Sequence, residues 1–304
     1  MSWRKLGRVY VAGGERDWQR THAFCPTVLD VGDRLRVLCA FLDGERVGRV
    51  GFVDVDAADP LRVLAVSERP ALDVGVAGTF DDNGVTPLSV VRLGDGRVRL
   101  YYVGWQLGVR VRYFLFTGAA ESDDDGRTFR RVSEAPVLDR SDGELMVRSS
   151  GLVQRDGDGF RMWYAGGSEW VEAADGTRRP HYALRHLRSA DGLTWPDRGE
   201  VCLDPGEDEH GFARPAVVRD GDELRMWVSV RHLSVGYRMG YAVSRDGVRW
   251  ERRDAEAGLD VSAQGWDSDA VCLPCIVDAP AGRLLFYNGN NYGETGFGVA
   301  VWDA

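Results

Sequence analysis

The 304-residue chain contains one strand pattern five times at a nearly constant spacing. Each copy follows a turn rich in glycine and aspartate and alternates apolar with polar residues, as β-strands with one buried face do. The copies span residues 33–38, 96–102, 159–164, 223–228 and 282–287. Because another apolar strand precedes each copy, the sequence predicts five β-hairpins.

The strand that opens each hairpin begins near a proline. These positions are Pro26, Pro87, Pro215 and Pro274, with Ser150 in the third copy, and they lie 61, 63, 65 and 59 residues apart. Five repeats of this length account for the whole chain and leave no room for a second domain. We therefore expect one domain over residues 1–304.

A further turn occurs in the second, third and fourth copies, and each example contains an aspartate, a glycine and a final aromatic residue. The aspartate can accept hydrogen bonds from turn amides, the glycine can adopt positive φ, and the aromatic ring can pack beneath the outer hairpin. We therefore interpret Asp125, Asp191 and Asp246 as structural turn residues without a catalytic role.

Helical periodicity is nearly absent from the chain, and each repeat has room for two hairpins. Repetition of this kind predicts an all-β fold, a five-bladed β-propeller with four antiparallel strands per blade and a central funnel. The innermost strand of every blade lines the funnel. The residues just ahead of the five proline positions are therefore expected to converge on one pocket.

Charge and composition exclude several classes of partner. The formal net charge is -9 and the arginines are scattered among acids, which opposes binding to nucleic acid. No leader pattern and no apolar run of membrane-spanning length occurs, so we expect a cytoplasmic protein without a membrane partner. The five cysteines, an odd number, are expected to stay reduced. The oligomeric state is left open.

Acidic residues recur just ahead of the inner strands of several repeats. In a propeller they would face each other across a partly desolvated funnel, where burial and like charge separate their pKa values as acid/base catalysis requires. The candidate catalytic residues are Asp82, Glu209, Asp267 and Asp269, with Asp81 as an alternative to Asp82. A solvated position on the rim is the alternative for any one of them.

Candidate substrate-binding residues lie near these acids, on the inner strands, at the ends of strands and in the loops after them. Arg148 and Arg214 lie on inner strands and either bind an anionic group or form ion pairs that brace neighbouring blades. Aromatic faces beside amide side chains suit a sugar ring, and packing between blades is their alternative role. The full set of these candidates is His22, Asp81, Trp105, Arg148, Trp170, His210, Arg214, Cys272, Asn290 and Tyr292.

Metal and thiol chemistry have less support in the sequence. The five histidines lack the spacing of a zinc helix, so we expect no resident metal or other cofactor, although an ion on the funnel axis is left open. Cys272 and Cys275 are three apart on a strand and point to opposite faces, so they form no disulfide or metal site unless a bulge at Pro274 intervenes. A thiol enzyme that uses Cys272 or Cys25 with His22 is a minor alternative.

The chain resembles the five-bladed propeller glycosidase superfamily, which includes glycoside hydrolase families 43, 32, 68 and 130. The resemblance covers the whole chain through its five-fold period, the Ser-x-Asp-Gly-x-x-Trp turns and the segments 80–84 and 213–215. Within the superfamily, segments 287–290 and 295–298 are similar to a bacterial group described only as glycosidase-like.

This resemblance implies hydrolysis or phosphorolysis of a glycosidic bond by carboxylates of the inner strands. It implies that Glu209 is the acid and that Asp82 or Asp267 is the base. The chain departs from the superfamily in blade one, where Thr21 and His22 stand in place of an aspartate.

Two hypotheses of function follow. The leading one is an enzyme that acts on a glycoside or sugar conjugate by general acid/base catalysis between opposed carboxylates, with a role in biosynthesis as one variant. The alternative is a sugar-binding propeller without turnover, which the missing aspartate of blade one supports. Both expect a small-molecule sugar or glycoconjugate as the partner.

Overall fold

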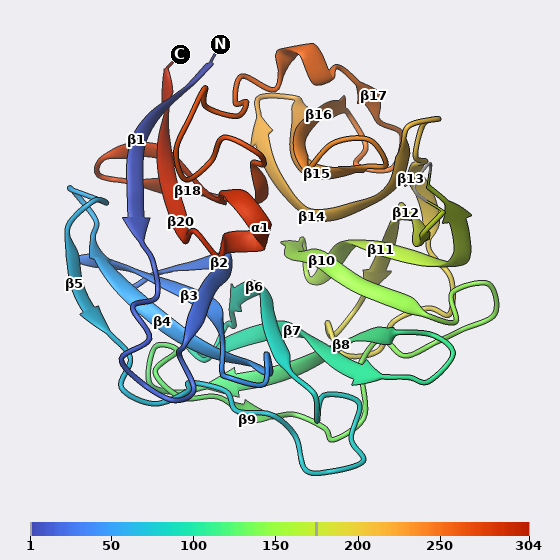
Figure 1. Cartoon of the computed structure of the whole chain (residues 1–304), viewed down its shortest axis with the longest axis horizontal. Coiled ribbons are helices and arrows are strands. Elements are labelled where there is room, and N and C mark those ends of the chain that lie inside the picture. Colours follow the sequence, from blue (N-terminus) through green and yellow to red (C-terminus); the bar gives the residue numbers. More distant parts are fainter. Residues whose placement is uncertain (1, 174–175, 304) are drawn as a thin grey trace.

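The structure, a computed structural model, describes residues 2–173 and 176–303. Its strands form five antiparallel blades of four strands around a common axis (Figure 1). Blades two to four are also joined edge to edge by short parallel pairings, so they form one continuous sheet. The predicted all-β, five-bladed β-propeller is confirmed.

The strands follow the chain from the inside of each blade to the outside. Blade one contains β2 (Thr21–Asp30), β3 (Arg34–Leu42), β4 (Gly48–Asp56) and β5 (Val63–Val66). Blade two contains β6 (Val85–Arg92), β7 (Val98–Leu107), β8 (Tyr113–Ser122) and β9 (Arg130–Arg131). Blade three contains β10 (Val147–Asp156), β11 (Gly159–Glu172), β12 (Arg178–Ser189) and β13 (Glu200–Leu203).

The last two blades follow the same plan with one exception in blade five. Blade four contains β14 (Glu209–Asp220), β15 (Glu223–His232), β16 (Arg238–Ser244) and β17 (Glu251–Arg252). Blade five contains β18 (Cys272–Ala279), β19 (Gly282–Asn288), β20 (Phe297–Asp303) and, on the outside, β1 (Ser2–Tyr10). The two short helices are η1 (Asp254–Glu256) and α1 (Asn290–Gly293). Within the described ranges no helix is long and apolar enough to cross a membrane.

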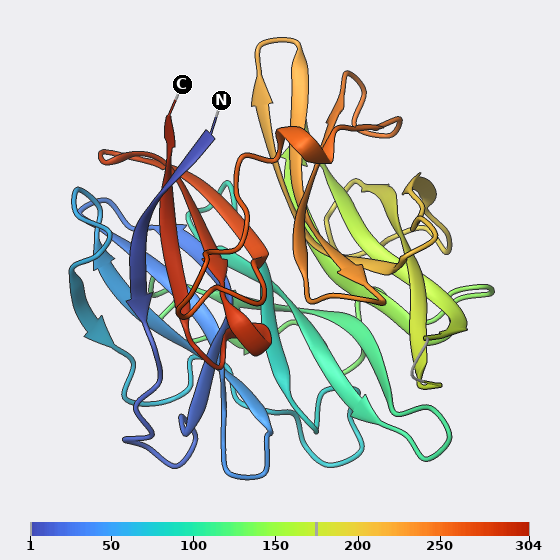
Figure 2. The ribbon, with the colours of Figure 1, turned by 45° about the horizontal axis from the view of Figure 1, so that its top comes forward.

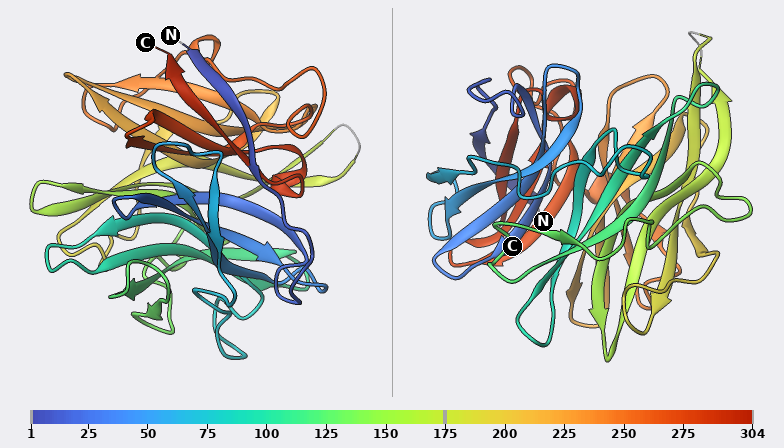
Figure 3. Two further views of the ribbon diagram at one scale, coloured as in Figure 1. Left: turned by 90° about the vertical axis from the view of Figure 1, so that its left-hand side faces the viewer. Right: turned by 90° about the horizontal axis from the view of Figure 1, so that it is seen from below.

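The first strand closes the ring. β1 pairs antiparallel with β20 from Ser2 opposite Asp303 to Tyr10 opposite Phe297. The two chain ends therefore lie side by side, as Figure 2 and Figure 3 show. Trp3 of β1 is buried among Trp227 and Trp302, with ring centroids 5.4 and 4.8 Å away. The N-terminal strand thus belongs to the last blade, a role that the repeat pattern had not predicted.

Each inner strand is interrupted at the proline position of its repeat. The ladder register shifts there in all five inner strands, which is the signature of a β-bulge. Cys25, Arg214 and Leu273, each directly before a proline, have positive φ values of 60°, 47° and 56°. In β18 the shift falls between Cys272 and Cys275, and both cysteines remain free thiols.

The predicted structural role of the aspartate turns is confirmed in blades three and four. The Asp191 carboxylate accepts hydrogen bonds from the amides of Leu193 and Thr194, each at 2.8 Å. These backbone donors lower the pKa of Asp191. The Asp246 carboxylate binds two turn amides in the same way, both at 2.9 Å.

The prediction for the turn of blade two is wrong by one residue. Asp124, and not Asp125, accepts hydrogen bonds from the amide and the hydroxyl of Thr128. Because this copy has an extra aspartate, the residue that accepts the turn hydrogen bonds is shifted by one position. Asp125 instead adopts φ 58° and pairs with Arg92. Three consecutive aspartates offered no way to choose among them from the sequence.

These turns also connect neighbouring blades. The Tyr101 hydroxyl of blade two donates to the Gly192 carbonyl of blade three at 2.8 Å. The Trp163 indole of blade three donates to the Gly247 carbonyl of blade four at 2.6 Å. Each turn therefore receives a buried donor from the preceding blade, which fixes the angle between the two.

Candidate functional site

The inner strands begin at one end of the central funnel, which we call the mouth (Figure 1). Because neighbouring strands are antiparallel, the turns between the second and third strands of each blade lie at the same end. In blade two, for example, Val85 is opposite Gly104, and Leu107 is opposite Tyr113. The loops before the inner strands and α1 complete the mouth.

A cluster of one arginine and four tyrosines lies at the mouth. We call Tyr113, Tyr182, Arg231, Tyr237 and Tyr292 the mouth cluster. The Arg231 guanidinium donates to the Tyr182 hydroxyl and lies 5.5 Å from the centroid of the Tyr182 ring and 5.4 Å from that of Tyr237. Tyr237 meets Tyr292 edge to face at 5.4 Å. The cluster thus joins blades two, three, four and five, since Tyr113 packs on the hydrophobic cluster that contains Tyr182.

The mouth cluster combines buried and accessible atoms. Tyr182 is buried, Arg231 and Tyr237 are half-buried, and Tyr292 is 45% exposed. Burial raises the pKa of Tyr182 and of Tyr237. Both hydroxyls are therefore protonated at neutral pH and able to donate hydrogen bonds.

Several predicted binding residues surround this cluster. Trp105 contacts Tyr113 edge to face at 5.5 Å, and Trp170 packs with both on the hydrophobic cluster around Tyr182. His210 of β14 interacts electrostatically with Arg231, and its Nδ1 lies 2.9 Å from the carbonyl oxygen of Pro180. Tyr292 of the mouth cluster and the aromatic residues around the cluster were therefore among the predicted residues, whereas Arg231 and the other three tyrosines were missed.

The other predicted binding residues from blades one and five have structural partners. Nδ1 of buried His22 lies 3.0 Å from the Thr21 hydroxyl, whereas its Nε2 has no hydrogen-bond partner among the described residues. Burial and the charge of Arg46 lower the pKa of His22. Asn290 accepts a hydrogen bond from the Asp269 amide at 2.7 Å and so fixes the loop before β18.

Below the mouth, an arginine of blade four reaches across to blade one. Arg214 of blade four donates to the sulfur of Cys25 at 2.6 Å and to the carbonyl of Pro26 at 3.0 Å, both in blade one. Because blades four and one are not neighbours in a five-membered ring, this side chain crosses the axis. Arg214 is 2% exposed and forms no ion pair with any described residue. It therefore braces the ring through a thiol sulfur and a carbonyl and not through a carboxylate.

Arg148 forms an ion pair, as one of the two alternatives expected, but the pair lies within blade three and does not join neighbouring blades. Its guanidinium donates to Glu144 at 2.8 Å and to the Asp139 carbonyl at 2.6 Å. Both charged groups are buried, with side-chain exposures of 4% and 0%. Arg148 is thus occupied within the protein.

The thiol alternative finds little support in the site. Burial raises the pKa of Cys25 and of Cys272, although Arg214 lowers that of Cys25. Both thiols are therefore protonated at neutral pH, whereas a nucleophile needs the thiolate. The described residues also contain no group of three histidine, cysteine, aspartate or glutamate side chains placed to hold a metal ion.

Most predicted carboxylates are bound to cations within their own blade. Asp81 accepts hydrogen bonds from the Tyr102 hydroxyl at 3.0 Å and from Arg131 at 2.8 Å. Asp267 is bound in the same way by Tyr287 at 3.0 Å and by Lys5 at 2.7 Å. We call this arrangement of acid, tyrosine and cation a carboxylate clasp. It attaches the loop before the inner strand to the outer strand of the same blade.

Blades three and four hold an acid in a similar manner. Glu144 is bound by Tyr164, Arg148 and Arg185. Glu209 pairs with Arg252 through both oxygens, at 2.8 Å each. Burial raises the pKa of Glu209, but the hydrogen bonds from Arg252 and from the Gly206 amide, together with the charge of Arg252, outweigh burial, and the pKa is lowered. A general acid needs the opposite shift.

Two predicted catalytic carboxylates have no cationic partner among the described residues. Half-buried Asp82 accepts a hydrogen bond from the Gly78 amide at 2.8 Å. Asp269 is exposed, and its backbone carbonyl accepts a hydrogen bond from Arg238 at 2.8 Å. The catalytic roles of Asp82, Glu209, Asp267 and Asp269 stay predictions.

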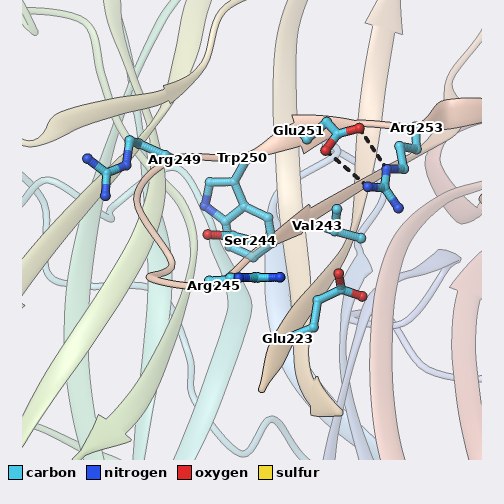
Figure 4. A pocket seen from close by; sticks show the side chains of 8 residues that line it. All are labelled: Glu223, Val243, Ser244, Arg245, Arg249, Trp250, Glu251 and Arg253. Atoms are coloured by element: carbon cyan, nitrogen blue, oxygen red, sulfur yellow. Dashed lines mark hydrogen bonds and ion pairs between the residues drawn. The ribbon is translucent and has the colours of Figure 1, made fainter. Parts of the chain in front are cut away.

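Two hollows on the outer strands differ in character from the mouth. One, of about 420 Å³, lies on blade four (Figure 4), and one of about 330 Å³ occupies the equivalent place on blade two. In the first, Glu251 pairs with Arg253 at 2.9 Å, and the Trp250 indole donates to the Gly247 carbonyl. These groups already have partners within the protein, so we place the candidate site at the mouth.

Two buried histidines predict a pH dependence of stability. Burial, with repulsion from nearby arginines, lowers the pKa of His186 to about 4 and that of His210 to about 4. In the unfolded chain both protonate below about pH 6.5. Between pH 6.5 and 4 the unfolded state therefore binds more protons than the folded state. As the pH is lowered through this range, the free energy of unfolding decreases by up to about 3 kcal/mol per histidine.

Urea unfolding at pH 7.5 and 4.5 measures this effect. His186→Gln and His210→Gln should each lose less stability on acidification than the wild type does. Equal losses in all three proteins would contradict the assignment.

Some known proteins are similar to the chain in sequence, and others are similar to it in fold. No protein-family model matches it. Two curated proteins of Mycobacterium tuberculosis, uncharacterized protein MT1551 and uncharacterized protein Rv1502, are each 39% identical to it over 303 residues, covering 99% of this chain and 99% of each relative.

The solved structures that are similar include carbohydrate-active enzymes. One, from the GH130 family of mannoside phosphorylases and glycoside hydrolases, has a TM-score of 0.76 at 14% identity and covers 99% of this chain and 93% of its own. A thermostable family-43 glycoside hydrolase has a TM-score of 0.69 at 14% identity and covers 93% of this chain and 91% of its own. The chain therefore has the propeller fold of these glycosidase families.

Proposed function

Because the chain belongs to the same protein family as uncharacterized protein Rv1502 of Mycobacterium tuberculosis and has the glycosidase propeller fold, we propose that it acts on a glycoside or sugar conjugate held at the mouth. The observation that carries this proposal is the mouth cluster with its aromatic rim. Tyrosine and tryptophan faces stack on the apolar faces of a sugar ring, while hydroxyl and guanidinium groups bind its oxygens.

The mouth is suited to a small ligand. Below it, Arg214 of blade four spans the axis to Cys25 and Pro26 of blade one, so a ligand at the mouth lies above a buried side chain. Four blades contribute side chains to the mouth cluster and its rim, and each blade is fixed to its neighbours by buried hydrogen bonds. A site on such a scaffold needs little reorganisation when the ligand binds.

For the chemistry, we assign general acid/base catalysis to Asp82 and Asp269. They are the two candidates whose carboxylates pair with no cation in the described part of the chain, and they come from blades two and five, which are not adjacent. A free carboxylate can exchange a proton with a leaving group or with an attacking water molecule.

Turnover of a panel of aryl glycosides and disaccharides, with and without inorganic phosphate, tests this assignment. Asp82→Asn and Asp269→Asn should each lower turnover of an identified substrate by about 10²- to 10⁴-fold. Asp125→Asn, an exposed aspartate in a structural turn, is the matched control and should leave turnover unchanged. Full activity in both site variants would exclude these residues as acid and base.

A sugar-binding protein without turnover is the second candidate. It is favoured by the ion pairs of three predicted carboxylates, because Asp81, Glu209 and Asp267 are already bound to cations. Calorimetric titration of the same panel separates the two candidates. Micromolar binding with no product after prolonged incubation would support the binding protein, and bond cleavage would exclude it.

A further inference from the structure

Arg231 pairs with no carboxylate of the described residues, although acids outnumber bases in this chain. The sequence has 47 acidic residues against 38 lysines and arginines. Other arginines near the inner strands have found an acid: Arg131 pairs with Asp81, and Arg252 pairs with Glu209. Arg231 forms no ion pair with any residue in the described ranges 2–173 and 176–303.

The guanidinium of Arg231 also has unused hydrogen-bonding capacity. Only its Nη1 donates to a described residue, the Tyr182 hydroxyl. Nε and Nη2 donate to no described residue, and neither is among the fully buried polar atoms that lack a hydrogen-bond partner. They are therefore accessible to a ligand. An arginine has five N–H groups in a planar fork, which matches the two oxygens of a carboxylate or phosphate.

The surroundings of Arg231 favour an anion. The faces of the Tyr182 and Tyr237 rings hold the guanidinium in place without neutralising it. The Tyr182 hydroxyl accepts from Arg231, so its own proton is free to be donated. His210 is near enough for the charge of Arg231 to help lower its pKa. A half-buried cation in such a place is costly unless an anion compensates it.

We infer that Arg231, with the hydroxyls of Tyr182 and Tyr237, forms an oxyanion site that holds a carboxylate or phosphate group in the mouth. This inference rests on the proposed function insofar as the anion is part of the sugar ligand, such as a uronate carboxylate or a sugar phosphate. Free inorganic phosphate is the other source of the same chemistry. Arg231 is then the residue that selects charged over neutral sugars.

Packing alone is the competing explanation for Arg231. A guanidinium between two tyrosine rings contributes through its flat surface as well as through its charge. Arg231→Met keeps much of the apolar stem and removes the charge, whereas Arg231→Lys keeps the charge and removes the fork. Comparison of the two therefore separates the ionic role from packing.

The test is calorimetric titration of the full chain at low salt with neutral hexoses, hexose 1-phosphates, glucuronate and inorganic phosphate. We expect the charged sugars to bind at least 10-fold more tightly than the neutral hexoses. Arg231→Met should weaken charged-sugar binding by about 10- to 100-fold, and Arg231→Lys should weaken it less. Arg245→Met, on the outer hollow of the same blade, should change nothing.

The outcomes distinguish this inference from the proposed function. Neutral and charged sugars that bind equally, with no loss in Arg231→Met, would overturn the inference and leave the proposed function standing. Inorganic phosphate that binds through Arg231 while no sugar adds affinity would support the oxyanion site and count against the sugar ligand. Thermal unfolding of each variant ensures that lost binding is not lost folding.

Discussion

Replacing Glu144 with glutamine is expected to lower the free energy of unfolding by about 3–5 kcal/mol. The Glu144 side chain is fully buried and accepts hydrogen bonds from Arg148 and Tyr164, each at 2.8 Å. Arg185 lies 3.4 Å away and has a side-chain exposure of only 12%. Glutamine has nearly the same shape but no charge, so two buried guanidinium groups would lose their counter-ion.

Denaturant unfolding at pH 7 measures this loss. Glu251→Gln is the matched control, because Glu251 also pairs with an arginine but has a side-chain exposure of 68%. The control should unfold like the wild type, since exposed ion pairs are screened by water. If the two variants were equally stable, the clasp in blade three would be no more than a surface ion pair.

The clasps explain why the sequence predicted the positions of the acidic residues along the chain but not the direction of their side chains. Asp81 and Asp267 lie just ahead of inner strands, as predicted, but the repeat pattern does not say which way a loop side chain points. A tyrosine on the second strand and a cation on the outer strand draw each acid into its blade. The recurrence of Tyr102 and Tyr287 at one position of the repeat was the available signal.

Most of the mouth cluster was missed for a related reason. Tyr182, Arg231 and Tyr237 lie on the second and third strands or in the turn between them, whereas most of the predicted residues lie on the inner strands or in the loops before them. Turn residues vary between repeats and follow no period. Arg231, which directly follows the apolar stretch Met226–Val230, was the available signal, because a charged residue that continues a buried strand needs a partner.

The fold itself was predictable because hydrophobic alternation and turn residues recur with a fixed period. The bulges were predictable in part, since proline cannot donate a ladder hydrogen bond and marks an interruption. Ring closure was not predictable in this way. β1 has no counterpart at the start of the other repeats, and only its pairing with β20 reveals that it completes blade five.

Deletion of residues 1–10 is therefore expected to abolish cooperative folding at 25 °C. Loss of Trp3, buried between Trp227 and Trp302, costs about 3–5 kcal/mol by itself. Loss of Lys5 leaves the buried Asp267 carboxylate without its cation, which costs about as much again. Together these approach the whole stability of an ordinary domain, about 5–15 kcal/mol. Calorimetry and near-ultraviolet circular dichroism detect the loss.

A circular permutant supplies the control for this deletion. Ser2 is paired with Asp303, so a short turn can join the end of β20 to the start of β1. A chain of residues 11–304, that turn and residues 1–10 keeps every contact of β1 and removes only the connection between Tyr10 and β2. We expect it to recover most of the wild-type unfolding temperature. A deletion variant as stable as the wild type would show that β1 does not close the ring. A permutant as unstable as the deletion would show that the connection to β2 matters more than the strand.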